Sequence, residues 1–496
     1  MQTDAPHSDA RTVQEYIDET PYWADGTPSR DVPMTGMQWR IWTLASAGKF
    51  FEGLVVFMTG VALPLIVQEF QLDAMSKGMV GAVPLVGILI GATALGGLAD
   101  HFGRKTMFIM EMILFAICLT LLVFSPNYEY LLAALFGVGL SLGCDYPTAH
   151  MIISESIPSS NRGRLVLGAF GFQAIGALAG TGVGYLILMD VPDISAWRWM
   201  YATAVIPAVV VVLARFSITD SAPWLASVGK MKEARQETSR LLRREPPYPS
   251  EIHLAAPQTH TNKNDFTNSY GRLFTAQFRR ATILASVPWF LQDLSTYGIG
   301  IFTPTILAKA VGGSHEHAHN LATLIHQDMV AAKGAAFIDI LLLVGIIGAV
   351  LLADRLGRIR LQVFGFIGCA AGLFIATLSL DAHGEMQTFL LFAGFMLFSL
   401  MTNLGPNAMT YLIAGEVFPT AIRGKGAGVA ASAAKIGAAL TAFLFPVLLA
   451  DLGTKTILYI LMGTSFLGAA TTWLYRIETT GINLDTLEYG DRQDCS

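Results

Sequence analysis

Three polar side chains recur at a regular interval in a segment that is otherwise apolar. Trp289, Asp293 and Tyr297 are four residues apart, so in a helix they lie along one face. An indole, a carboxyl and a phenol can all form hydrogen bonds to a ligand. A row of Trp and Tyr alone is typical of helix packing or of a membrane interface. The acid between the two rings favours a binding face.

A second acid, Asp145, stands in the segment LGCDYPTAHMIISESIP, residues 142–158. The apolar neighbours predict a membrane helix, in which an ionisable side chain costs about 2.5–3.5 kcal/mol on insertion scales. Such residues usually face a cavity or a partner, and they mark transport pathways. The predicted membrane segments contain few of them, and the main ones are Glu52, Glu111, Asp145, Asp293, Asp339 and Lys435. Of these, Glu111 and Asp339 are interpreted as structural or gating residues.

The segments that carry these residues are long and apolar enough to cross a membrane. Only 14% of the 496 residues are charged, against about a quarter in soluble proteins, and the mean hydropathy is +0.51. Runs of about 20 apolar residues span a bilayer core. We therefore expect an all-α polytopic membrane protein with twelve transmembrane helices. The predicted spans are 42–70, 79–99, 105–124, 128–152, 164–189, 197–216, 280–307, 334–353, 360–380, 386–414, 424–450 and 455–475.

These spans fall into two bundles of six helices, joined by a polar loop. The loop contains GKMKEARQETSRLLRR, which predicts short amphipathic helices. The expected parts are an N-terminal tail, a first bundle, the central loop, a second bundle and a C-terminal tail: 1–40, 41–216, 217–278, 279–476 and 477–496.

Basic residues indicate the orientation of the helices. They concentrate in the central loop and in every second short loop, and basic loops stay on the cytoplasmic side. We therefore expect both tails and the central loop to be cytoplasmic. The first forty residues are polar, which excludes a cleavable signal peptide and predicts a solvated tail.

Two loop motifs recur in order in the two halves. GGLADHFGRK (96–105) is repeated as VLLADRLGRI (350–359), and SESIPSSNRGR (154–164) as AGEVFPTAIRGK (414–425). The inference is two pseudo-symmetric bundles, with a substrate site near the midplane between them. We interpret these motifs as gating latches, in which acids pair with basic residues or helix ends, the alternative being simple anchoring by positive charge. The motif residues are Gly97, Asp100, Gly103, Arg104, Glu155 and Arg162, with Asp354, Gly357, Arg358, Glu416 and Arg423 in the second half.

The glycine-rich loop and its repeat resemble the signature loop of the major facilitator superfamily. The segment TDSAPWLASVGKMKEA (219–234) is similar to the start of the central loop in the sugar-porter-like members of that superfamily. The resemblance covers the chain from about residue 40 onward. It implies the major facilitator fold, an all-α transporter of small molecules rather than an enzyme.

Four polar residues occupy matched positions in the two halves. Asn407 is equivalent to Tyr146 under the second repeat, and Lys435 lies within one residue of the equivalent of Gln173. We expect the single cation Lys435, surrounded by neutral donors, to bind an anion. Asp293 suits an anion that also carries a proton, such as phosphate, whereas fully ionised sulfate would be repelled.

The fourth predicted span also resembles a more specific group. GCDYPTAHMIISE is similar to the fourth-helix signature of proton-coupled inorganic phosphate symporters, except that Cys144 replaces a glycine. The resemblance implies Asp145 as the proton-handling acid. It also implies seven phosphate ligands, Tyr146, Gln173, Trp289, Asp293, Tyr297, Asn407 and Lys435. The first helix departs from the group, because FFEGLVVF has Glu52 but lacks a second acid.

The expected function is therefore proton-coupled symport of a small anion, most simply inorganic phosphate. An apolar site favours the protonated carboxyl and a nearby cation favours the ionised one, so Asp145 or Glu52 could load and release the coupling proton. The alternatives are a proton symporter of a small organic metabolite, such as a sugar acid or aromatic acid, and a non-transporting nutrient receptor. We expect a monomer in the plasma or bacterial inner membrane, in contact with lipid and without a nucleic-acid partner.

No metal or other cofactor is expected. The four cysteines show neither CxxC nor Cys/His spacing. His315 and His319 in the external loop GGSHEHAHN could bind a metal if helical, but a solvated loop is the favoured interpretation. Protons are the expected coupling ion.

Overall fold

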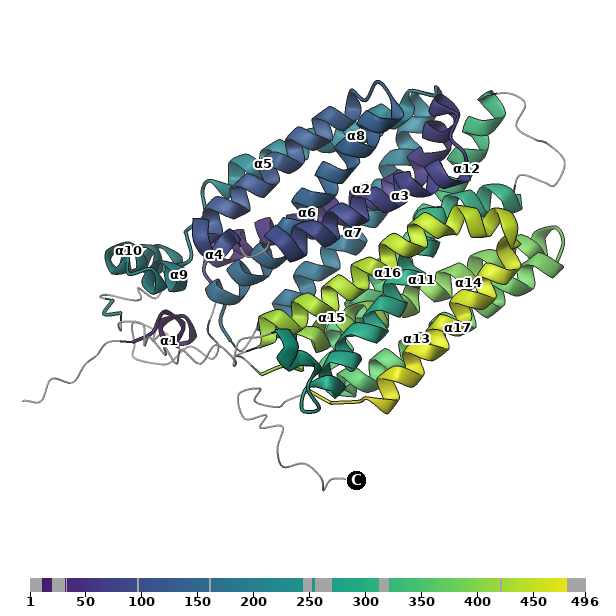
Figure 1. Cartoon of the computed structure of the whole chain (residues 1–496). Coiled ribbons are helices and arrows are strands. Elements are labelled where there is room, and N and C mark those ends of the chain that lie inside the picture. Colours follow the sequence, from purple (N-terminus) through teal and green to yellow (C-terminus); the bar gives the residue numbers. More distant parts are fainter. Residues whose placement is uncertain are drawn as a thin grey trace, which may run out of the picture.

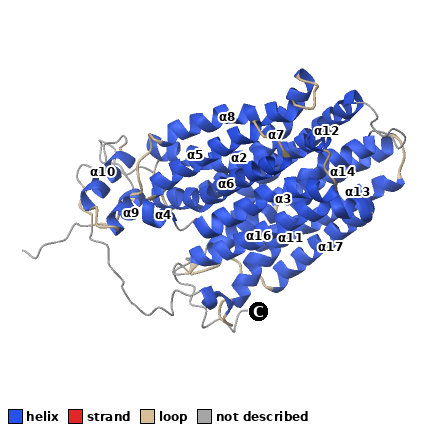
Figure 2. Ribbon diagram, turned by 45° about the horizontal axis from the view of Figure 1, so that its top comes forward, coloured by secondary structure: helices blue, strands red, loops and turns tan. Residues whose placement is uncertain are grey.

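The computed structural model describes residues 11–19, 32, 34–95, 98–159, 162–243, 252–254, 270–311, 321–419 and 422–479. Within these ranges the regular elements are helices, and no β-strand is present (Figure 2). Figure 1 shows two groups of long helices, purple to teal for the first half and green to yellow for the second.

The first half contains six long helices. They are α2 (Gly36–Phe70), α3 (Ala74–Ile90), α5 (Arg104–Val123), α6 (Tyr128–Ser156), α7 (Arg162–Asp190) and α8 (Ala196–Arg215). The short π-helix η1 (Gly91–Leu95) continues α3, and α4 (Leu98–Phe102) precedes α5. Asp73 caps α3 by accepting a hydrogen bond from the Ser76 amide, and its hydrogen bonds with Ser76 lower the pKa of the Asp73 carboxyl.

The second half repeats this arrangement with one helix divided. Its helices are α11 (Arg279–Val311), α12 (Leu321–Leu356), α13 (Arg358–Leu378), α14 (Glu385–Leu404), α15 (Pro406–Glu416), α16 (Arg423–Asp451) and α17 (Gly453–Leu474), with a short 3-10 turn η4 (Ser379–Asp381) after α13. Between the halves lie α9 (Ala222–Ser227), α10 (Met231–Leu241) and the 3-10 turn η3 (Tyr270–Phe274).

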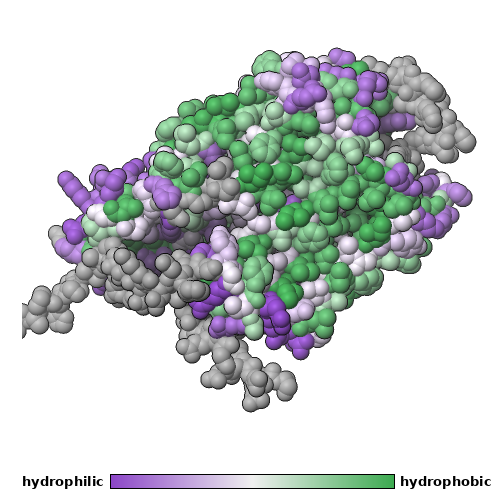
Figure 3. All heavy atoms as spheres, viewed as in Figure 1, coloured by the Kyte–Doolittle hydropathy of each residue, from purple (hydrophilic) through white to green (hydrophobic). Residues whose placement is uncertain are grey.

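The chain is a multi-pass membrane protein with the expected fold. Eleven spans among the described helices are long and apolar enough to cross a membrane, with α14 and α15 counted together. The remaining long helix, α11, is the seventh in chain order, and it is the least hydrophobic because it carries Gln292, Asp293 and several hydroxyl residues. Figure 3 shows a broad apolar band between two hydrophilic ends. Ile206, 72% exposed, is one of many large apolar side chains that face outward, as lipid contact requires.

Some boundaries differ from those predicted. The predicted helix 386–414 is interrupted at Gly405, whose backbone (φ −117°, ψ −92°) ends α14, and Pro406 then begins α15. Gly405 packs against the backbone of Gly365 in α13, where a side chain would not fit. The predicted helix 79–99 includes the π-helical turn η1, in which the wider turn is set by contact with α6.

The N-terminal tail is not wholly solvated, which corrects the prediction. A short helix, α1 (Val13–Asp18), buries Val13, Tyr16 and Ile17 against the first half. Asp18 accepts hydrogen bonds from the amide and hydroxyl of Ser159, in the turn between α6 and α7. In Figure 1, α1, α9 and α10 lie at one end of the molecule. We call this the basic end, because Arg104, Arg358 and the other basic loop residues lie there.

The two halves are in contact at the opposite end. A Cβ on Gly60 of α2 would lie 2.4 Å from the carbonyl oxygen of Ile301 in α11. A Cβ on Gly78 of α3 would lie 2.2 Å from the carbonyl oxygen of Phe443 in α16. Glycine at both positions lets the helix backbones touch, so this end of the molecule is closed.

Candidate functional site

A cavity of about 420 Å³ lies where the two halves meet. Helices α2, α3, α6 and α7 and the turn η1 contribute one side, and α11, α15 and α16 contribute the other. The lining residues are Lys49, Ile88, Ala92, Tyr146, Phe170, Gln173, Trp289, Asp293, Tyr297, Asn407, Ala431 and Lys435. The seven residues proposed as substrate ligands are all in this set, although they are up to 289 positions apart in the chain.

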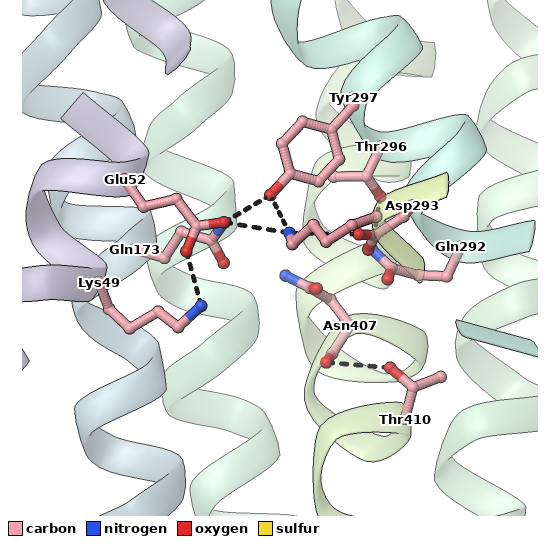
Figure 4. A network of polar contacts seen from close by, with 10 residues as sticks. Lys49, Glu52, Gln173, Gln292, Asp293, Thr296, Tyr297, Asn407 and Thr410 are labelled. Atoms are coloured by element: carbon pink, nitrogen blue, oxygen red, sulfur yellow. Dashed lines mark hydrogen bonds and ion pairs between the residues drawn. The ribbon is translucent and has the colours of Figure 1, made fainter. Parts of the chain in front are cut away.

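Lys435 of α16 reaches the centre of the molecule rather than the membrane surface. Its ammonium is 2.7 Å from the Tyr297 hydroxyl, 3.1 Å from Glu52 Oε1 and 3.4 Å from Asp293 Oδ2 (Figure 4). The lysine side chain is 13% exposed and the two carboxylates are 5% and 3% exposed. A cation and two acids therefore share a site with little water.

A second buried cation, Lys49, was missed in the sequence, and the expectation of a single buried cation was wrong. Its ammonium lies 2.6 Å from Glu52 Oε2, and it sits 4.2 Å from the centre of the Tyr146 ring. Lys49 and Glu52 both belong to α2, three residues apart, so one turn of helix brings them together. The spacing in KFFE was the signal for this pair. Figure 4 shows both side chains reaching toward the second half.

Tyr297 joins these charges to the neutral donors. Its hydroxyl donates to Glu52 Oε1 at 2.9 Å and accepts from Lys435 and from the Gln173 amide at 3.2 Å. Trp289 and Asp293 lie on the same face of α11 as Tyr297, as their spacing predicts. The Asn407 amide donates to Asn403 at 2.6 Å, so part of its hydrogen-bonding capacity is used within its own half.

Tyr411 of α15, also missed, covers the cavity toward the basic end. Its ring stacks on Phe170 at 4.6 Å and meets Tyr146 and Trp289 edge-on at 5.9 and 6.1 Å. Its hydroxyl lies 3.4 Å from Nδ1 of His150. His150 and Tyr411 are equivalent under the repeat that relates Tyr146 to Asn407, which is the signal that could have identified them.

Asp145 lies beside this cavity and has a cation of its own. Its carboxylate is 2.6 Å from Arg215, which is fully buried at the end of α8 and also donates to carbonyls of Phe108 and Leu44. Arg215 was not among the candidate residues predicted from the sequence, because it stands at the very end of an apolar span. A Cβ on Gly48 would lie 1.7 Å from the Asp145 carboxylate, so glycine makes room for it.

Asp145 shares a second cavity, of about 370 Å³, with Lys49, Glu52 and His150. Glu111 of α5 is buried near this cavity and accepts a hydrogen bond from Thr148 at 3.3 Å. Asp339 of α12 accepts one from Thr181 of α7 at 3.0 Å, and so links the two halves.

The loop motifs form the same contact in both halves at the basic end. Arg104 lies 3.5 Å from Glu155, and Arg358 lies 3.3 Å from Glu416. Each acid is also bonded by a hydroxyl from the segment that follows the last helix of its half, Ser221 or Thr479. The arginine side chains reach back to carbonyls of Ala99 and Ala353.

The remaining motif residues take different positions. Gly103 and Gly357 have positive φ (93° and 84°) and begin α5 and α13. Asp354 lies 2.9 Å from Arg358 and 3.5 Å from Arg164 of the first half. Arg423 donates to the Phe418 carbonyl.

Not every motif prediction can be followed in the structure. Glu155 contacts Arg104 and Ser221, and not Arg162, the basic residue of its own motif. Gly97 and the side chain of Asp100 lie outside the described residues, as do His315 and His319. Among the described residues there is no cluster of three His, Cys, Asp or Glu that could hold a metal ion.

Comparisons with known proteins agree with this architecture. The family model described as "Sugar (and other) transporter" matches residues 41–490. The chain belongs to this family. It is therefore a membrane transporter of small molecules with the major facilitator fold, and not an enzyme.

Similar proteins carry several kinds of name. The inner membrane metabolite transport protein YgcS of Escherichia coli K12 is 29% identical over 455 residues, covering 92% of this chain and 94% of the relative. A putative inorganic phosphate transporter, C1683.01 of Schizosaccharomyces pombe, is 26% identical over 521 residues, with 92% and 88% covered. The xylose transporter XylE of E. coli, in a partially occluded inward-open conformation, matches with a TM-score of 0.72 at 18% identity, covering 90% of this chain and all of the other. This last likeness establishes the fold.

Proposed function

We propose that this transporter carries a small anion, inorganic phosphate, across the membrane together with a proton. The observation that supports the proposal is the balance of charge at the centre. There the cations Lys49 and Lys435 face the carboxylates Glu52 and Asp293. Two positive and two negative charges sum to zero when all four groups are ionised.

A monovalent anion that enters this site gives it a net negative charge. Uncompensated charge away from water is costly, so the complex is favoured if one carboxyl takes up a proton. The sum then returns to zero. Anion and proton therefore enter together, which is the defining property of a symporter.

The neutral groups of the cavity suit a protonated oxyanion. Monobasic phosphate has oxygens that accept hydrogen bonds from Lys435, the Gln173 amide and the Trp289 indole. Its P–OH groups can donate to Asp293. Sulfate has no proton to donate, so it would face the Asp293 carboxylate with repulsion.

Alternating access requires each end of the molecule to open in turn. In the proposed cycle the basic end faces the cytoplasm, in line with the distribution of Lys and Arg. The paired latches Arg104–Glu155 and Arg358–Glu416 act at that end. The glycine contacts of Gly60 act at the other end.

The direct test is uptake of radiolabelled phosphate by purified protein in liposomes under an imposed pH gradient. We expect accumulation that a protonophore abolishes and that arsenate, but not sulfate, inhibits. Lys455→Ala, which removes a surface lysine, serves as the control and should transport normally. Saturable phosphate uptake that is indifferent to the gradient would contradict proton coupling, and absence of phosphate flux would contradict the cargo.

A second candidate is symport of a small organic acid, favoured by the aromatic lining of the cavity. Phe170, Trp289 and Tyr146 present rings that an apolar or aromatic substrate could contact, while its carboxylate meets the lysines. The name of YgcS refers to a metabolite in general terms. Proton-driven uptake of an aromatic or sugar acid, without phosphate uptake, would favour this candidate. Thermal stabilisation by a ligand without any flux would instead indicate a receptor.

A further inference from the structure

Glu52 is bound by two lysines that both line the substrate cavity. Lys49 Nζ lies 2.6 Å from Glu52 Oε2, and Lys435 Nζ lies 3.1 Å from Glu52 Oε1. Each oxygen of one carboxylate therefore faces one ammonium, and the two lysines come from opposite halves of the molecule, Lys49 from α2 and Lys435 from α16. Both lysines line the substrate cavity, whereas Glu52 lines only the adjoining cavity that it shares with Asp145.

We propose that Glu52 is an internal anion that competes with the substrate for both lysines, and that Lys49 is a second cationic ligand of the substrate. The proposal rests on the proposed anion transport and assigns a role to Lys49. In the absence of substrate, Glu52 satisfies both ammonium groups. A substrate anion in the cavity takes over these hydrogen bonds once Glu52 is neutralised by a proton.

The position of Lys49 supports a role in binding rather than only in structure. Glu52 has a cation on each of its two oxygens, so Lys49 can turn to a substrate while Lys435 stays within 3.1 Å of that carboxylate. Lys49 also lies over the ring of Tyr146, itself a cavity residue, at 4.2 Å from the ring centre. Its three donors can bind an anion in the cavity without any movement of helix α2.

Several other groups face Glu52 and set its charge environment. They are Asp145, Tyr146 and His150 of α6, Gln173 of α7, Asp293 and Tyr297 of α11, Tyr411 of α15 and Lys435 of α16. Asp145 is already paired with Arg215, and the one ion pair of Asp293 among the described residues is with Lys435, at 3.4 Å. Glu52 is therefore the carboxylate whose protonation releases the most positive charge toward the cavity.

This arrangement makes a definite prediction about proton linkage. If the bound complex carries a proton on Glu52 and the free protein does not, binding takes up a proton. Affinity for the anion then falls by about tenfold for each pH unit above the pKa that Glu52 has in the ligand-free protein. In Glu52→Gln neither lysine faces a carboxylate at position 52 at any pH, so affinity should be independent of pH and at least as high as that of the wild type in acid.

The experiment measures equilibrium binding of radiolabelled phosphate, with an aromatic carboxylate in parallel, to full-length protein in nanodiscs. A range from about pH 4.5 to about pH 5.5 keeps phosphate mainly monobasic, so its own titration does not intervene. The variants are Glu52→Gln, Lys49→Gln and Lys49→Arg, with Lys455→Gln as the matched surface control. Gel filtration in detergent identifies any variant that fails to fold, and Lys49→Arg keeps the charge if Lys49→Gln proves unstable.

We expect Lys49→Gln to lower the affinity for the anion at least tenfold and Lys49→Arg to retain most of the wild-type affinity. We expect Glu52→Gln to abolish the pH dependence of binding. Unchanged affinity in Lys49→Gln would overturn the role of Lys49. A wild-type pH slope that persists in Glu52→Gln would overturn the role of Glu52, while leaving anion transport intact. If neither the wild type nor Glu52→Gln binds phosphate but Glu52→Gln binds the aromatic carboxylate, the competition is supported and the phosphate proposal fails. If Glu52→Gln binds neither anion, the inference is wrong.

Discussion

Among the individual side chains, Lys435 is the cation that contacts both carboxylates at the centre. It lies within 3.4 Å of Tyr297, Glu52 and Asp293, in surroundings that water hardly reaches. A charged group of this kind can exist in the membrane only because opposite charges and hydrogen-bond partners surround it. Its substitution therefore tests the anion site directly.

We predict that Lys435→Ala weakens substrate binding by at least about 30-fold. Truncation of one member of a buried charge pair costs about 2–5 kcal/mol, and here the lost cation also faces the substrate. Equilibrium binding of radiolabelled phosphate measures the effect, with Lys455→Ala as the control. Retained affinity would mean that the anion does not bind at Lys435.

Asp145 calls for a different experiment, because its carboxylate is paired with a fully buried arginine. We predict that Asp145→Asn lowers the stability of the protein by about 3–5 kcal/mol, since Arg215 is left as an uncompensated buried charge. The measurement is the thermal unfolding midpoint in detergent. The double variant Asp145→Asn/Arg215→Gln should recover part of the loss. No recovery would indicate that the pair is not the source of the effect.

Among the helices, the two latches at the basic end are related by the internal repeat. In each half, an arginine at the start of the third helix meets an acid at the end of the fourth. Each latch also includes a hydroxyl from the segment after the sixth helix. A latch therefore ties three helix ends of one bundle together and stiffens that end of the molecule.

We predict that Arg104→Gln and Arg358→Gln shift the protein in the same direction, toward conformations open at the basic end. Exposed charge pairs contribute little to stability, but these two pairs are largely buried. Each substitution breaks a contact within its own half, so the two effects should be independent. Alkylation of a cysteine placed at Tyr411 would report the opening. Opposite shifts in the two variants would contradict the pseudo-symmetric role.

For the molecule as a whole, the described conformation is closed at the end opposite the basic end. Backbone contact between Gly60 and Ile301 leaves no room for a side chain there. We predict that Gly60→Trp prevents this closure and abolishes transport, while substrate binding is retained. Spin labels at Glu129 and Glu385, exposed at that end in opposite halves, should move apart. An unchanged distance would show that the contact does not control closure.

Much of this architecture can be predicted from local sequence. Long apolar runs predict the helices, because a helix that crosses lipid must satisfy its backbone internally and present apolar side chains. The repeated motifs predict the two related halves. Glu52, Asp293 and Lys435 stand out because ionisable residues are rare in such segments. The interruption at Gly405 was missed, since an apolar run has the same composition on either side of a break.

The sequence by itself determined that this protein is a two-bundle membrane transporter with a few charged residues in its spans. Only the tertiary structure decided which charges are partners. Lys435 and Glu52 are 383 residues apart, and Asp145 meets Arg215 across different helices. Hydropathy is a local property of the chain, whereas a buried charge is satisfied by whichever opposite charge the packing of distant helices brings within a few ångströms.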